Sequence, residues 1–149
     1  MGNICRSPSA EGFFGHHLAG SRISALVSAD SAGTHRYHIG RPPDSRAISA
    51  AARFGVDISG LRARAITVDD HENFDLILAM DEQNLELITQ SRPGAFRAET
   101  RLMMDFAPDE GLTQVPDPYY GSQRDFALMC ELLDVATANL VKELETRLV

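Results

Sequence analysis

Little in this chain would direct it to nucleic acid, to a membrane or to an oxidising compartment. Cysteine occurs only twice in 149 residues, at Cys5 and Cys130, which excludes a disulfide framework and leads us to expect a reducing, cytoplasmic location. No apolar run approaches the roughly 20 residues that span a bilayer. We expect no signal peptide, because the first residues form a Gly-Asn-Ile-Cys-Arg-Ser-Pro string. Acidic residues outnumber basic ones, 21 to 14, which argues against nucleic acid or an anionic membrane as the main partner.

Internal repeats and low-complexity tracts are also missing, and the length fits one domain over residues 1–149. Apolar periodicity and capping residues predict alternating helices and strands. The expected helices follow Ser7 and cover 44–54, 81–89 and 123–148, the expected strands cover 23–31, 74–80 and 99–104, and 105–121 form a long loop. This order implies an α/β fold in which a parallel sheet is covered on both faces.

The loop before the first helix is a candidate anion site. A helix N-terminus directs backbone N–H groups and partial positive charge at an anion. Gly2 permits a positive φ and Asn3 tolerates a left-handed conformation, so several N–H groups can converge. Arg6 supplies a planar fork for two phosphate oxygens. Taken alone, the loop is equally consistent with a turn and a capped helix that carries a surface arginine.

A second candidate site is Pro116-Asp117-Pro118-Tyr119-Tyr120-Gly121. Two prolines stiffen the loop around Asp117, whose carboxyl group can protonate a leaving oxygen. The adjacent Tyr119 and Tyr120 can flank an aromatic substrate. On its own, the segment is also consistent with a turn that holds a partly buried aromatic anchor.

Together the two sites resemble the low-molecular-weight protein tyrosine phosphatases. The resemblance covers essentially the whole chain and rests on these segments: Met-Gly-Asn-Ile-Cys-Arg-Ser-Pro-Ser-Ala-Glu at 1–11, Ser-Ala-Gly-Thr at 31–34, Gly-Arg-Pro-Pro-Asp at 40–44, Arg-Ala-Arg at 62–64, Met-Asp-Glu-Gln-Asn-Leu at 80–85 and Asp-Pro-Tyr-Tyr-Gly at 117–121. It implies a three-layer α/β sandwich around a four-stranded parallel sheet. It also implies a hydrolase that dephosphorylates phosphotyrosine proteins, binds phosphate or a similar oxyanion, and needs no cofactor or metal.

The resemblance also implies a role for each site residue. Arg6 and the loop of Gly2, Asn3, Ile4, Cys5 and Ser7 would hold the phosphate. Side chains of Asn3, Ser7 and Ser31 would fix the loop by hydrogen bonds. Asp117 would be the general acid, and Tyr119 and Tyr120 would line the pocket. Leu61 departs from the family, because many members have a histidine there that pairs with the equivalent of Asp81.

The nucleophile of the family lies outside the printed sequence. The family pattern is a cysteine, five residues and an arginine, so Arg6 places the nucleophile one position before Met1. Cys5 has Glu11, not arginine, at the required spacing, and by resemblance it is the second, redox-protective cysteine. An alternating chain usually opens with a strand, yet here a helix comes first. We therefore expect an N-terminally truncated domain that has lost its first strand, and we expect residues 1–149 by themselves to be catalytically inactive.

Other functions remain as alternatives. Residues 1–149 by themselves are consistent with a non-catalytic protein that binds phosphate or phosphotyrosine. Arsenate reduction on the same fold needs further cysteines in the middle of the chain, where none occurs. A metal site is disfavoured, since His16 and His17 are helix neighbours that point about 100° apart. We expect 34–38 to be a solvated loop and 69–72 an exposed helix start.

Overall fold

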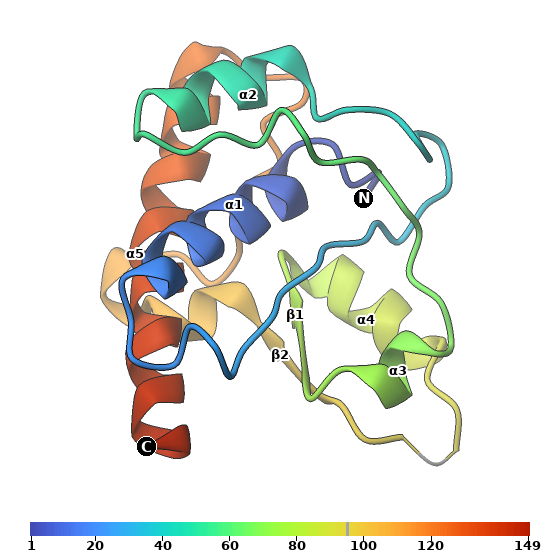
Figure 1. The fold of residues 1–149 in the computed structure, drawn as a ribbon. Coiled ribbons are helices and arrows are strands. Elements are labelled where there is room, and N and C mark those ends of the chain that lie inside the picture. Colours follow the sequence, from blue (N-terminus) through green and yellow to red (C-terminus); the bar gives the residue numbers. More distant parts are fainter. Residues whose placement is uncertain (95) are drawn as a thin grey trace.

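The computed structural model describes residues 1–94 and 96–149, and its helices lie around a short parallel sheet (Figure 1). The elements are α1 (Arg6–Ala19), α2 (Ser45–Ala52), α3 (Asp70–Asn73), β1 (Leu76–Ala79), α4 (Glu82–Gln90), β2 (Glu99–Leu102), the 3-10 turns η1 (Met103–Phe106) and η2 (Pro108–Glu110), and α5 (Gln123–Leu148). No helix of the described residues is long and apolar enough to cross a membrane.

The sheet is smaller than the sequence predicts. β1 and β2 pair in parallel, with Leu76 opposite Glu99 and Ala79 opposite Leu102, and α4 packs against both strands. The only other strand-like pairing of the described residues is an isolated parallel bridge between Gly33 and Ala65. The α/β class is therefore confirmed, whereas the structure contains a two-stranded ladder in place of the expected four-stranded sheet.

The predicted strand at 23–31 is wrong. Ile23 is buried, but the chain turns directly after it, with a hydrogen bond from the Leu26 N–H to the Ile23 carbonyl at 2.8 Å. Residues 27–31 run on without strand pairing. The β-branched residues suit a strand, but a strand also needs a neighbour for its N–H and C=O groups. Within the described ranges, no strand pairs with this segment.

The longer helices were predicted well because their ends carry clear signals. Asp44 and Asp81 accept backbone hydrogen bonds at the starts of α2 and α4. Two details differ from the prediction. α1 begins at Arg6 with Cys5 as its N-cap, so Ser7 lies inside the helix. The segment 69–72 does start α3, but its Asp70 is 7% exposed and its neighbour His71 is fully buried.

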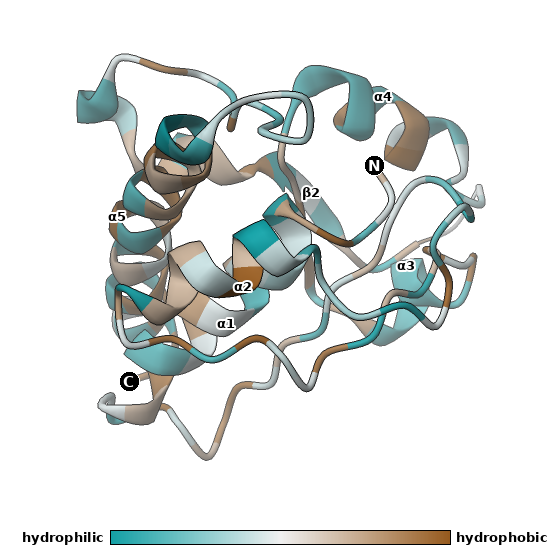
Figure 2. Ribbon diagram, turned by 90° about the horizontal axis from the view of Figure 1, so that it is seen from above, coloured by the Kyte–Doolittle hydropathy of each residue, from teal (hydrophilic) through white to brown (hydrophobic). Residues whose placement is uncertain are grey.

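The core lies where α5 packs against α1, α2 and η1. Hydrophilic and hydrophobic residues alternate along α5 in Figure 2, as expected for a helix that buries one face. Its buried residues are Phe126, Met129, Cys130, Leu132, Leu133, Ala136, Thr137, Leu140 and Val141. From α1, Phe13 meets the Phe54 ring edge-on at 5.4 Å between centroids. This packing fixes α1, and with it the loop that precedes α1.

Candidate active site

Asn3 holds the loop before α1 in shape. It is the one non-glycine residue of the described chain with a positive φ, 61°, and it is 3% exposed. Its side-chain amide donates to Ser7 Oγ at 2.8 Å and to Ser31 Oγ at 3.0 Å, and its Oδ1 accepts from the Arg64 N–H at 3.0 Å. The expected hydrogen bonds among Asn3, Ser7 and Ser31 are therefore present, and Arg64 adds a partner that the sequence did not indicate.

Gly2 has a different role from the predicted one. Its φ is not positive. Instead, a Cβ on Gly2 would lie 2.5 Å from Cδ2 of His38, and a Cβ on Gly33 would lie 2.4 Å from the Met1 carbonyl oxygen. Both glycines permit a close approach between the loop and residues 33–44, which we call the cationic wall. Its far end is also attached, because the Asp44 N–H donates to the Ile4 carbonyl at 2.8 Å.

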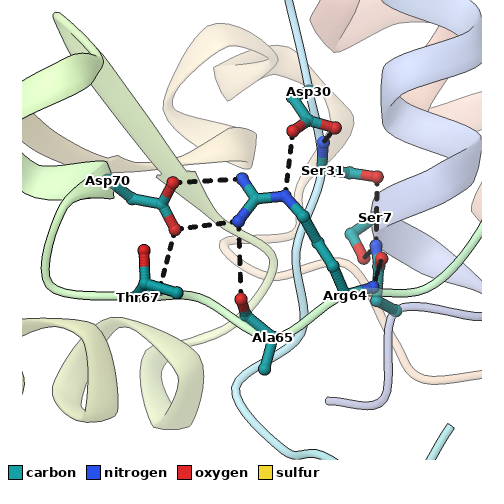
Figure 3. A network of polar contacts seen from close by, with 8 residues as sticks. Ser7, Asp30, Ser31, Arg64, Ala65, Thr67 and Asp70 are labelled. Atoms are coloured by element: carbon teal, nitrogen blue, oxygen red, sulfur yellow. Dashed lines mark hydrogen bonds and ion pairs between the residues drawn. The ribbon is translucent and has the colours of Figure 1, made fainter. Parts of the chain in front are cut away.

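An ion-pair network centred on Arg64 supports the loop (Figure 3). The Arg64 guanidinium donates to Asp30 Oδ2 at 2.9 Å and to the two Asp70 oxygens at 3.0 and 3.2 Å. Burial raises the pKa of the Asp70 carboxyl, but hydrogen bonds from Arg64 and Thr67 outweigh burial and leave that pKa lowered. This network anchors Arg64, whose backbone N–H holds Asn3.

Arg6 is buried at the centre of the site, with 4% of its surface exposed. Its Nη1 donates to Asp81 Oδ2 at 2.6 Å and to the Val115 carbonyl at 2.8 Å. Its Nη2 has no hydrogen-bond partner among the described residues and lies 3.9 Å from Asp117 Oδ2. A buried guanidinium N–H without a partner is costly, so Nη2 marks a place for an anionic oxygen.

Asp81 orients Arg6 without a histidine. Its Oδ1 accepts from the Asn84 N–H at 2.7 Å, which caps α4. Burial raises the pKa of the Asp81 carboxyl, but the hydrogen bonds from Asn84 and Arg6 outweigh burial and lower it below its ordinary value. Leu61 is half-buried and packs against the core. Asp81 therefore remains ionised beside Arg6.

Asp117 and the two tyrosines reach the site from the loop between η2 and α5. The fully buried Pro118 anchors this loop, and Asp117 Oδ1 accepts from the Tyr119 N–H at 3.1 Å. The Asp117 side chain is 44% exposed. The rings of Tyr119 and Tyr120 meet edge-on at 4.9 Å, and Tyr120 is 96% exposed. An exposed carboxyl group and two aromatic rings thus stand at the entrance.

These groups surround one cavity of about 360 Å³. Of the predicted site residues, all but Ser31 line it: Gly2, Asn3, Ile4, Cys5, Arg6, Ser7, Asp117, Tyr119 and Tyr120. Tyr37 and His38 line it as well; they belong to the segment 34–38, which is a loop as expected and in which Tyr37 is 80% exposed. The ring of His35 stacks on Tyr37 at 5.3 Å and 16°. The density of aromatic and basic residues in this short segment is the signal that could have revealed them.

Cys5 does not have the properties of a nucleophile. It is 6% exposed, and burial, together with the charges of Asp44 and Asp117, raises the pKa of its thiol to about 12. A helix N-terminus normally lowers a thiol pKa, but here burial is the larger effect. Cys5 therefore remains a neutral thiol at physiological pH.

The geometry defines a class of protein: an α/β domain in which the loop before α1, a buried arginine and a carboxyl group line one cavity. The model of the family described as low molecular weight phosphotyrosine protein phosphatase matches residues 1–148. A putative low-molecular-weight protein-tyrosine-phosphatase of Synechocystis is 38% identical over 100% of this chain and 95% of its own length.

Solved structures show the same likeness. A protein tyrosine phosphatase of Entamoeba histolytica with Hepes in its active site has a TM-score of 0.94 and 34% identity, covering 100% of this chain and 95% of that one. Vibrio vulnificus Wzb in complex with benzylphosphonate has a TM-score of 0.81 and 32% identity, covering 96% and 93%. This chain belongs to the low-molecular-weight phosphotyrosine protein phosphatase family.

Proposed function

We propose that the cavity binds the phosphoryl group of phosphotyrosine and that its residues hydrolyse the phosphate ester through a phosphocysteine intermediate. The observation that carries the proposal is Arg6 Nη2, which is buried, lacks a partner among the described residues and lies 3.9 Å from the Asp117 carboxylate. Relatives with Hepes or benzylphosphonate bound support an oxyanion at this place.

The chemistry proceeds in two steps. A cysteine thiolate attacks phosphorus, the bond from phosphorus to the tyrosine oxygen breaks, and Asp117 gives its proton to that oxygen. Asp117 then takes a proton from water, whose oxygen attacks phosphorus and releases phosphate and thiolate. Arg6 and the backbone N–H groups of residues 2–7 stabilise the phosphoryl oxygens in both transition states. Tyr119 and Tyr120 hold the phenyl ring.

The thiolate of this mechanism comes from the position before Met1 in the family pattern. Within residues 1–149, Cys5 is the cysteine of the loop, and burial keeps it neutral. Residues 1–149 alone therefore act as a phosphate and phosphotyrosine binder and do not turn substrate over. Arsenate reduction finds no support, since Cys130 is fully buried in α5.

Binding and turnover test this proposal separately. Residues 1–149 are titrated with benzylphosphonate, and we expect Arg6→Lys to weaken binding at least tenfold because a lysine replaces the fork by a point charge. Arg22→Lys, a change at an exposed arginine, is the control. Equal binding by the Arg6 and Arg22 variants contradicts the assignment of Arg6.

Turnover is measured with p-nitrophenyl phosphate. Residues 1–149 should not hydrolyse it, and the chain extended by a strand that ends in cysteine directly before Met1 should hydrolyse it without added metal. Clear activity of purified residues 1–149, or none in the extended chain, contradicts the phosphocysteine mechanism.

A further inference from the structure

The positive charge of this chain is concentrated in one segment. Residues 34–64 contain six of the 14 basic residues and only two of the 21 acidic ones. The rest of the chain contains eight basic and 19 acidic residues and is strongly negative. An anionic partner is therefore repelled by most of the molecule and attracted to this segment.

The cationic wall brings part of this charge to the cavity. Tyr37 and His38 of the wall line the cavity, and the exposed Arg36 and Arg41 flank them in sequence. A turn fixes the second arginine relative to His38, since the Arg41 N–H donates to the His38 carbonyl at 2.9 Å and Gly40 adopts a φ of 82°. Because the wall is attached to the loop at both ends, Arg36 precedes the cavity-lining Tyr37 directly and Arg41 is held one turn after the cavity-lining His38.

Both arginines are available to a ligand. Within residues 1–94 and 96–149, neither Arg36 nor Arg41 forms an ion pair with a carboxylate. Asp44, the first acidic residue after them, is engaged by Arg46 at 2.9 Å. Arg46 also lies over the Tyr119 ring at 5.5 Å. The wall thus offers two guanidinium groups that can each bind a carboxylate through two hydrogen bonds.

We infer that the site selects phosphotyrosine embedded in an acidic stretch of polypeptide, with aspartate or glutamate side chains of the substrate bound by Arg36 and Arg41. The inference rests on the proposed function, since the phosphoryl group must first occupy the place beside Arg6. The Asp117 carboxyl group is the acidic side chain among the residues that line the cavity. An acidic flank is therefore directed to the cationic wall.

The expected effect is moderate and depends on salt. Exposed ion pairs each contribute little in water, so two of them should strengthen binding of an acidic peptide about three- to tenfold over a neutral one. The preference should shrink as ionic strength rises, because salt screens exposed charges.

The test compares dissociation constants of residues 1–149 for three phosphotyrosine peptides with acidic, neutral or basic flanks, and for the unphosphorylated acidic peptide. We expect the order acidic, neutral, basic, and no measurable binding without the phosphate. Arg36→Ser/Arg41→Ser should remove the preference and leave the affinity for the neutral peptide unchanged. Arg22→Ser/Lys142→Ser removes the same charge from elsewhere and should keep the preference.

Three results would overturn the inference. They are equal binding of the acidic and neutral peptides, a preference that survives in Arg36→Ser/Arg41→Ser, and tight binding of the unphosphorylated acidic peptide, which would identify a general polyanion surface. Failure of every phosphotyrosine peptide to bind would instead overturn the proposed function, and the inference with it.

Discussion

The proposed role of Asp117 depends on the substrate, because a general acid accelerates the reaction more when the leaving group is more basic. In the chain extended by the cysteine, Asp117→Asn should slow aryl phosphates with poor leaving groups by about 10²–10⁴-fold and those with good ones far less. The measurement is kcat for a series of aryl phosphates whose phenol leaving groups differ in basicity. An equal loss across the series would show that Asp117 only shapes its loop.

The two cysteines should be unreactive in the native chain. Burial raises the pKa of Cys5 to about 12 and that of Cys130 to about 11, so both thiols stay protonated at neutral pH and the nucleophilic thiolate is scarce. Iodoacetamide at neutral pH should modify neither residue in the folded chain and both after unfolding in urea, as read by mass spectrometry. Rapid alkylation of Cys5 in the folded chain would contradict its burial.

Single residues also show what the sequence could and could not predict about the site. Arg6 and Asp117 are 111 positions apart; the family resemblance predicts both for one site, and both line one cavity in the structure. His38 was missed because its place at the cavity arises from the chain folding back over Gly2. The aromatic and basic composition of 34–38 marks the segment as unusual but does not say which other loop it contacts. The same holds for Arg64, which reaches the loop through its backbone N–H.

Helices and strands were predicted well where the signal lies in the local sequence and poorly where the element depends on a partner elsewhere in the chain. α5 was expected at residues 123–148 and is found there, because a long amphipathic pattern is a local property. The segment 23–31 has strand composition but no strand, because pairing depends on a neighbour elsewhere in the chain. Helix ends were predicted where a side chain caps them, as Asp44 does, and missed at α1, where no side chain does.

The contact between the loop and the cationic wall should be sensitive to one methyl group. A Cβ at Gly33 would lie 2.4 Å from the Met1 carbonyl oxygen and 3.0 Å from the Asn3 nitrogen, so the backbone must shift. Gly33→Ala should lower the free energy of unfolding by about 1–3 kcal/mol and weaken benzylphosphonate binding.

Gly15 provides the matched control, since it lies within α1 and a Cβ there meets nothing within 4 Å. Gly15→Ala should stabilise the chain by about 0.5–1 kcal/mol and leave binding unchanged. Urea unfolding and titration measure both variants. If Gly33→Ala behaves like Gly15→Ala, the close contact is not a constraint.

At the scale of the whole molecule, the sheet is the part that offers room for another element. β1 pairs with β2 along one edge, and the cavity extends from Met1 to Leu78 and Ala79 of β1. A further strand could pair with the edge of β1 that β2 does not occupy and would add backbone hydrogen bonds there.

An N-terminal extension with strand composition should therefore raise the urea midpoint of residues 1–149. A Gly-Ser extension of the same length should not, because it orders poorly and buries no side chains. Equal midpoints for the two extended chains would show that the second edge of β1 accepts no strand.

The hydrogen bonds of Asn3 have a consequence for the thermodynamics of binding. Its partners Ser7, Ser31 and Arg64 come from three separate parts of the chain, so the loop is held from outside and has little conformational freedom left to lose. A ligand that enters such a preorganised loop meets a small entropic penalty for ordering it. Its association rate should then be limited by diffusion and desolvation rather than by a rearrangement of the protein.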